Sequence, residues 1–277
     1  MTNLLKADFK KVYKDKLFMV VCIIGLVFAV LTPLINFGML KLLSTQTDMS
    51  AESINALTGG QITAKYIFFV AFSPANDFGL IMPILFSVIL CKDFSQGTVR
   101  NKILSGKSRS QIFLSTYIVT TIMLVSLILI YAFMSLGVSL ILFDYSTTPF
   151  TIGDFWYALG SIGLWIVVYL AISAIVCLIA FVMKNVGLTI VMVIAVNMVL
   201  SLIGGLLSMA GGMLSANGSN LADVLTIIAN AIPFSATHGT GVEFKLIDVI
   251  VSLIASLAMA VGFVFLGMKI FNKKDLK

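Results

Sequence analysis

Residues 17–40 read LFMVVCIIGLVFAVLTPLINFGML, a run of 24 residues that contains no charged side chain. At about 1.5 Å per residue, an α-helix of this length crosses the roughly 30 Å of hydrocarbon in a lipid bilayer. The run is too long for the apolar region of a typical signal peptide, and no small-residue cleavage site ends it. We therefore expect residues 17–40 to remain in the protein as a first transmembrane helix.

The composition of the whole chain indicates the same class of protein. Hydrophobic residues make up 60% of the 277 residues and charged residues only 11%, whereas average soluble domains have roughly 45–50% and 25%. A soluble domain of this size could not bury so much apolar surface in one core. A bilayer accepts it, because lipid is the solvent for the outer face of each helix.

Further apolar segments follow the first one. The uncharged run at 78–91 has only 14 residues, so the second helix is expected to begin near Asn76 and to be kinked at Pro83. A series of glycines from Gly204 onward predicts that the fifth helix ends near Ala210. The predicted spans are residues 17–40, 76–91, 110–143, 155–183, 185–210 and 249–268. The sequence therefore predicts an all-α membrane protein with six transmembrane helices in a single domain, residues 1–277.

The charges predict the orientation of these helices. With six spans and the N-terminus inside, 15 of the 18 basic residues fall on the inner side and eight of the 12 acidic residues on the outer side. Only Lys41, Lys65 and Lys245 are basic and outside. Cytoplasmic segments of membrane proteins are enriched in Lys and Arg. We expect a multi-pass protein of the cell (plasma) membrane with both termini in the cytoplasm.

Residues 2–16 have the pattern of an amphipathic helix. Apolar side chains recur at helical spacing, at Leu5, Phe9, Val12 and Tyr13, and lysines occupy the other faces. This pattern predicts an interfacial helix that lies in the inner membrane interface and leads into the first span. The alternative is a plain basic segment that only anchors the topology.

The segment at 211–248 is expected on the outer side, between spans five and six. Its apolar residues are followed by Pro233 and Gly239, which favour a turn. We expect a short helix that dips into the outer membrane interface, formed around Leu221, Val224, Leu225, Ile227 and Ile228.

The inner segment at 92–109 is the strongest candidate for a functional site. Gly97 can break the descending helix, Thr98 can cap a new short helix, and Gly106 can end it. A short helix that presents apolar and basic side chains to the cytoplasm suits a groove on a soluble partner; the alternative is an ordinary basic loop. The candidate residues are Asp93, Gly97, Thr98, Val99, Arg100, Asn101, Lys102, Ile103 and Leu104.

Other chemistries are disfavoured. The stretch Ser105-Gly106-Lys107-Ser108 resembles the end of a phosphate-binding loop, but Asn101 stands where the first glycine is required and no strand precedes it. The single histidine, His238, lacks neighbouring metal ligands. We expect no catalytic site, no metal, no cofactor and no nucleic-acid partner. Apart from Asp77 at an outer helix end, the predicted spans hold no charges of the kind that ion-coupled carriers use, so energy for any uphill transport would come from another subunit.

The inner segment resembles the permease subunits of bacterial ABC-2-type exporters. Those proteins follow the second span with an acidic residue, Gly-Thr and a basic stretch, which here are Asp93, Gly97-Thr98, the run from Arg100 to Leu104, and Ser108-Arg109. Ile232-Pro233-Phe234 is similar to the family's proline–aromatic element. Members often carry glutamate where this chain has Asp93, so that position is a softer match.

The resemblance implies the fold of a type V exporter, with a second permease chain, identical or homologous, and two copies of a separate P-loop ATPase subunit. The helix between Gly97 and Leu104 would then be the coupling helix, and the interfacial helix would brace it. The substrate would be amphipathic or hydrophobic, such as a peptide antibiotic, a lantibiotic or a lipid. An alternative from another class is a non-transporting membrane scaffold or sensor that recruits cytoplasmic partners through the same segment.

Overall fold

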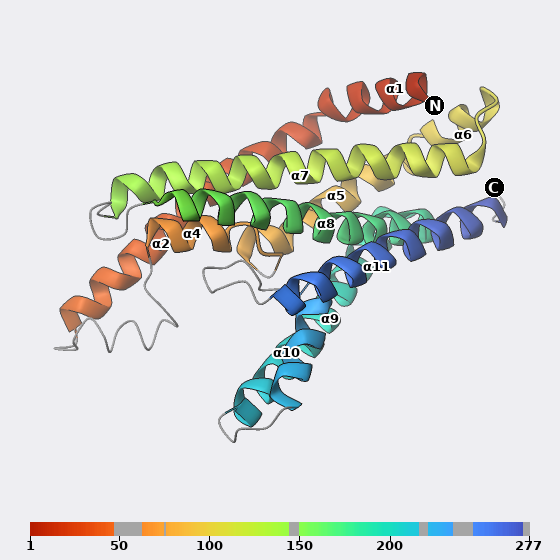
Figure 1. The fold of residues 1–277 in the computed structure, drawn as a ribbon. Helices are drawn as coiled ribbons and strands as arrows, with labels where there is room; N and C mark the ends of the chain where they lie inside the picture. The colour runs from red at the N-terminus through yellow and green to blue at the C-terminus, as the bar shows by residue number, and fades with distance from the viewer. Residues whose placement is uncertain (47–62, 75, 144–149, 216–220, 235–245, 274–277) are drawn as a thin grey trace.

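The computed structural model describes residues 1–46, 63–74, 76–143, 150–215, 221–234 and 246–273, and within these ranges the regular secondary structure is helical throughout (Figure 1). The prediction of an all-α membrane protein is confirmed. His238 and Lys245 lie outside the described residues. The helices are α1 Thr2–Tyr13, α2 Lys16–Gln46, α4 Ala64–Val70, α5 Asp77–Ser95, α6 Thr98–Leu104, α7 Arg109–Leu142, α8 Ile152–Met183, α9 Val186–Ser215, α10 Leu221–Ala231 and α11 Leu246–Lys273.

Five of the described helices, α2, α7, α8, α9 and α11, are long and apolar enough to cross a membrane. The predicted second span corresponds to α5, which has 19 residues and contains Pro83. At about 1.5 Å per residue, α5 is close to the minimum length for a span. The predicted count of six is therefore approximate.

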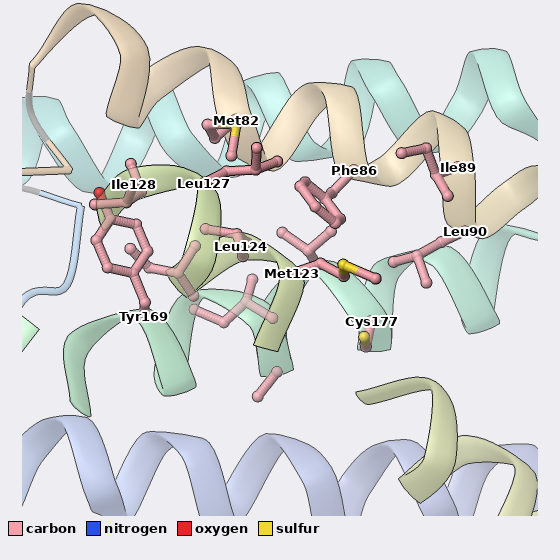
Figure 2. Close-up of a cluster of buried hydrophobic side chains, with 14 of the residues drawn as sticks. Met82, Phe86, Ile89, Leu90, Met123, Leu124, Leu127, Ile128, Tyr169 and Cys177 are labelled. Carbon is pink, nitrogen blue, oxygen red and sulfur yellow. The ribbon is translucent and has the colours of Figure 1, made fainter. Parts of the chain in front are cut away.

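Helix α8 lies at the centre of the bundle. It contacts α5, α7, α9 and α11, and the side chains of Trp165, Tyr169 and Ile172 are fully buried. Figure 2 shows Met82 and Phe86 of α5 beside Leu127 and Met123 of α7, with Tyr169 of α8 in the same buried cluster. Because lipid supplies no hydrophobic driving force between helices, this close packing is itself a main source of stability in the membrane.

Hydrogen bonds between helices supplement the packing. Thr121 of α7 and Ser173 of α8 have their hydroxyl oxygens 2.6 Å apart, and the Cys91 thiol of α5 donates to the Thr189 hydroxyl of α9 over 3.0 Å. The Tyr169 hydroxyl donates to the Phe72 carbonyl, 3.2 Å away. Such bonds contribute about 0.6–2 kcal/mol each within a bilayer.

The short helix α4 has no counterpart among the predicted elements. Thr63 caps its N-terminus by accepting from the backbone N–H of Tyr66, and Phe68 and Phe69 are buried. A tight turn then leads into α5, and a Cβ at Gly79 would lie 2.5 Å from the Ser73 carbonyl oxygen. A seven-residue segment in which Lys65 is the only charged residue carries too little periodicity to be distinguished from the start of the second span.

The end of the fifth span was predicted too early. Helix α9 continues to Ser215, so the glycines from Gly204 to Gly212 lie inside it instead of ending it. Close packing accounts for Gly211: a Cβ there would lie 2.8 Å from Thr226 and 3.1 Å from the Ala222 carbonyl oxygen, both in α10. The expected short helix is present as α10, and α11 already begins at Leu246, so most of the described residues between 211 and 248 are helical.

Only Lys184 and Asn185 separate α8 from α9, as the sequence predicted. Lys184 has φ +55°, the only positive value among the described residues other than glycine. Its left-handed conformation ends α8 and turns the chain directly into α9.

The start of α1, helix α6 and the end of α11 lie at the same end of the bundle, which we call the α6 end (Figure 1). The Arg109 guanidinium donates to the carbonyls of Phe271 and Asn272, 3.3 and 3.1 Å away, at the C-terminal end of α11. Asn272 in turn donates to the Ser110 hydroxyl over 2.9 Å. A cation and donors placed there satisfy carbonyls that have no partner within their own helix.

Gly267 provides a test of the packing between α11 and α7. A Cβ at this position would lie 2.2 Å from the ring of the fully buried Phe113, so Gly267→Ala is expected to destabilise the bundle by about 1–3 kcal/mol through overpacking. The control is Gly262→Ala in the same helix, where a Cβ meets nothing within 4 Å and the better helix propensity of alanine applies. The midpoints of thermal unfolding of the two variants are measured in mild detergent. Equal midpoints would contradict the close contact between Gly267 and Phe113.

Candidate functional site

Helix α6 is bounded by two glycines with left-handed backbone conformations. Gly97 precedes the helix with φ +65° and Gly106 follows it with φ +82°. At the C-terminal end the Gly106 N–H donates to the Ile103 carbonyl and the Lys107 N–H to the Lys102 carbonyl, the pattern of a Schellman motif. Gly106 therefore ends the helix, as predicted, and the stretch that resembles a phosphate-binding loop is a helix terminus.

The predicted N-terminal cap is wrong. Gly97 occupies the cap position and no side chain caps the helix. The Thr98 side chain instead accepts a hydrogen bond from the Lys11 ammonium of α1, 2.9 Å away. The hydroxyl has a distant cationic partner that the local sequence does not reveal.

One side of α6 packs against the bundle. Val99 is only 3% exposed and Ile103 packs against the same hydrophobic core. The Lys102 ammonium reaches the Asp8 carboxylate of α1 at 2.7 Å and Asp93 of α5 at 3.6 Å. The side chains of Lys102 and Asp8 are only 12% and 7% exposed, so water screens this pair little.

Further contacts extend this pair into a network that joins four helices. Lys11 forms an ion pair with Asp93, 2.5 Å away, and the Ser115 hydroxyl of α7 donates to the second oxygen of Asp8 over 2.6 Å. We call Asp8, Lys11, Asp93, Thr98, Lys102 and Ser115 the α1–α6 network. It holds α1 and α6 together against the ends of α5 and α7.

The predicted apolar face of α1 is divided in the structure. Leu5 and Val12 pack against the core, whereas Phe9 and Tyr13 are 42% and 65% exposed. The helix ends at Tyr13, earlier than predicted, and α2 begins at Lys16. Sequence reasoning missed Asp8, although a single acidic residue among lysines, on the same helical face as Leu4 and Val12, could have indicated a buried partner.

A second ion pair lies where α1 turns into α2. The Lys92 ammonium of α5 is 2.7 Å from both carboxylate oxygens of Asp15, and the Leu17 N–H donates to the same carboxylate. Burial alone would raise the pKa of Asp15, but the hydrogen bonds from Lys92 and Leu17 and the positive charges of Lys92 and Lys11 outweigh it and hold the pKa below its usual value.

The opposite side of α6 is free of the bundle. Arg100 and Asn101 are exposed, and Leu104 is 76% exposed. Among the described residues of this end, the acidic residues Asp8, Asp15 and Asp93 are all held in ion pairs. The outward surface of α6 therefore combines a cation with a large apolar side chain, and it suits a partner groove that offers acidic and apolar groups.

Four phenylalanines connect this end to the spans. Phe181 of α8 contacts Phe94 of α5, Phe113 of α7 and Phe271 of α11, with ring centroids 4.8–4.9 Å apart and edge-on geometry. Phe94 directly follows Asp93 of the α1–α6 network. These rings therefore pack four helices together next to the α1–α6 network.

These features define a polytopic all-α membrane protein with a short, braced helix displayed at one end. The chain belongs to the family described as "Protein of unknown function (DUF2705)", which matches residues 63–277. The matched part runs from just before α4 through α11. No curated protein matches the chain.

The pair between Asp8 and Lys102 can be tested by a double-mutant cycle. Asp8→Asn or Lys102→Gln alone leaves a poorly screened charge without its partner, and each is expected to lower stability by about 3 kcal/mol. The double variant should lose clearly less than the sum of the two. Lys10→Gln, at an exposed position of α1, is the control with no expected loss. Additive losses in thermal unfolding would show that the two side chains do not interact.

The Asp15–Lys92 pair predicts a pH dependence. Because the folded-state pKa of Asp15 is depressed, the pair contributes fully above the unfolded-state value of about 3.9, and its contribution is lost as the pH falls through the lower folded-state value. The difference in melting temperature between the wild-type protein and Asp15→Asn should be constant from about pH 7 to about pH 5 and shrink under more acidic conditions. A difference that grows on acidification would contradict the assigned pairing.

Proposed function

We propose that the chain is the membrane-spanning permease subunit of an ATP-driven ABC-2-type exporter. A separate P-loop ATPase, in two copies per complex, would bind the outward side of α6, and a second permease chain, identical or homologous, would complete the translocation path. Charge distribution supports placing the α6 end in the cytoplasm and the protein in the cell membrane. ATP would be hydrolysed on the partner, not on this chain.

The arrangement of α6 carries this proposal. A coupling helix must be firmly connected to the spans and yet leave one side available to its partner. Here Val99, Ile103 and Lys102 connect α6 to the bundle, whereas Arg100, Asn101 and Leu104 remain outside. The phenylalanine contacts around Phe181 offer a route by which a push on α6 reaches four helices.

The interior of the spans supports an amphipathic or hydrophobic substrate. In the described part of the spans, the buried polar residues carry neutral side chains, such as Thr121, Ser173, Thr189 and Asn197. Ion-coupled carriers usually place ionisable groups at such positions. A peptide antibiotic, a lantibiotic or a lipid fits these neutral surroundings better than an ion does.

A non-transporting scaffold or sensor is the second candidate. The same outward side of α6 would recruit a cytoplasmic partner, and the spans would only position it. A scaffold or sensor would need Arg100 and Leu104 to be accessible to the partner, but it would not need the contacts around Phe181.

The deciding experiment is co-purification from the native host with the variant Arg100→Glu/Leu104→Gln. Both altered side chains are exposed, so the fold should be retained; Ile103 is avoided because it packs against the core. We expect a P-loop ATPase to co-elute with the wild-type protein, at about one copy per chain, and to be lost from the variant. The control Lys273→Glu, on the same end of the bundle, changes the net charge by the same amount and should retain the ATPase.

The alternatives give different outcomes. Co-elution with a partner that is not an ATPase, lost from the same variant, would support the scaffold reading and contradict the transporter. Retention of the ATPase by the variant would show that α6 is not the docking helix.

A further inference from the structure

The outward surface of α1 has no role in the α1–α6 network. Successive residues of an α-helix are about 100° apart, so Phe9 and Tyr13 fall on one stripe and Lys6 and Lys10 on the adjoining one, with Lys14 next to them at the end of the helix. All five side chains are exposed. We call Lys6, Phe9, Lys10, Tyr13 and Lys14 the lysine–aromatic surface.

The network fixes the direction in which this surface points. Asp8 and Lys11 lie on the opposite side of α1 and are held by Lys102, Asp93, Thr98 and Ser115. The turn into α2 is held by the pair of Asp15 with Lys92. Because α1 is connected both along its length and at its end, it cannot roll freely, and the lysine–aromatic surface keeps one orientation relative to the spans.

Phospholipid is the partner that fits this combination of side chains. Helix α1 leads directly into the span α2, whose exposed side chains at Met19, Val20 and Ile23 are apolar, so the surface lies at the depth where the membrane begins. Aromatic rings prefer the headgroup region, and neighbouring lysines attract anionic headgroups there. A soluble anion would bind the lysines but would not interact with the exposed aromatic rings of Phe9 and Tyr13.

We propose that the lysine–aromatic surface binds the phosphate groups of anionic phospholipids in the leaflet at the α6 end. Asp8, the only carboxylate of α1, points away from this leaflet and is neutralised by Lys102, so the bound lipid faces cations only. A lipid that binds this orientation of α1 better than a detached one stabilises it. Through Lys102 and Thr98 the same lipid then stabilises the position of α6. The inference requires no ATPase and therefore does not depend on the proposed transport activity.

The test uses the full chain in nanodiscs of phosphatidylcholine alone or mixed with phosphatidylglycerol, followed by amide hydrogen exchange. Phosphatidylglycerol is expected to slow exchange in residues 2–13 and 98–104 by about tenfold, and high salt should remove the effect. The variant Lys6→Gln/Lys10→Gln/Lys14→Gln should lose the response in both segments. Lys269→Gln/Lys273→Gln, which removes exposed cations from α11 at the same end, should keep it.

Each part of the inference can fail separately. No response to phosphatidylglycerol, or an equal loss in the α11 variant, would overturn specific lipid binding by α1. Asp8→Asn/Thr98→Val, which removes both contacts between α1 and α6, tests the connection to α6: the response should persist in residues 2–13 and vanish in residues 98–104. If residues 98–104 of this variant still responded fully, the lipid would not act on α6 through the network.

Discussion

Hydrocarbon offers no water to a backbone N–H or C=O group, and an unsatisfied group there costs several kcal/mol. This constraint explains why the described chain consists of helices, in which each segment satisfies its own backbone. It also explains why backbone groups at several helix ends have hydrogen-bond partners. Arg109 donates to the last carbonyls of α11, Thr151 and Asp154 form a capping box at the start of α8, and a Schellman motif closes α6.

The charged residues at the α6 end are sorted by sign between the inside and the outside of the bundle. At the α6 end the carboxylates of Asp8, Asp15 and Asp93 face inward and bind lysines, whereas the remaining exposed cations face outward. Buried ion pairs contribute modestly to net stability, but they are costly to break and therefore favour one arrangement over others. The pairs thus act mainly on geometry: they determine which sides of α1 and α6 remain available to membrane and partner.

The apolar pattern predicted the long helices well. The bounds of α7 and the two-residue link between α8 and α9 follow from uncharged runs, because charges are excluded from the hydrocarbon. Features that depend on distant contacts were not predictable. Gly211 looked like a helix breaker because its neighbour Thr226 is not visible in the local sequence. Thr98 was assigned as a cap because its true partner, Lys11, lies 87 residues away, and α4 was missed because a helix of only seven residues shows no clear period.

The short link at Lys184 and Asn185 bears on how the protein enters the membrane during synthesis. With two residues between them, α8 and α9 cannot be inserted far apart or at very different times, and they enter as one helical hairpin. The partners of α8 in α5 and α7 are already made by then, whereas α11 is still to come. The most buried of the five long apolar helices thus stays open to lipid on its α11 side until α11 has been synthesised, so early arrest of translation would leave the bundle open along that side.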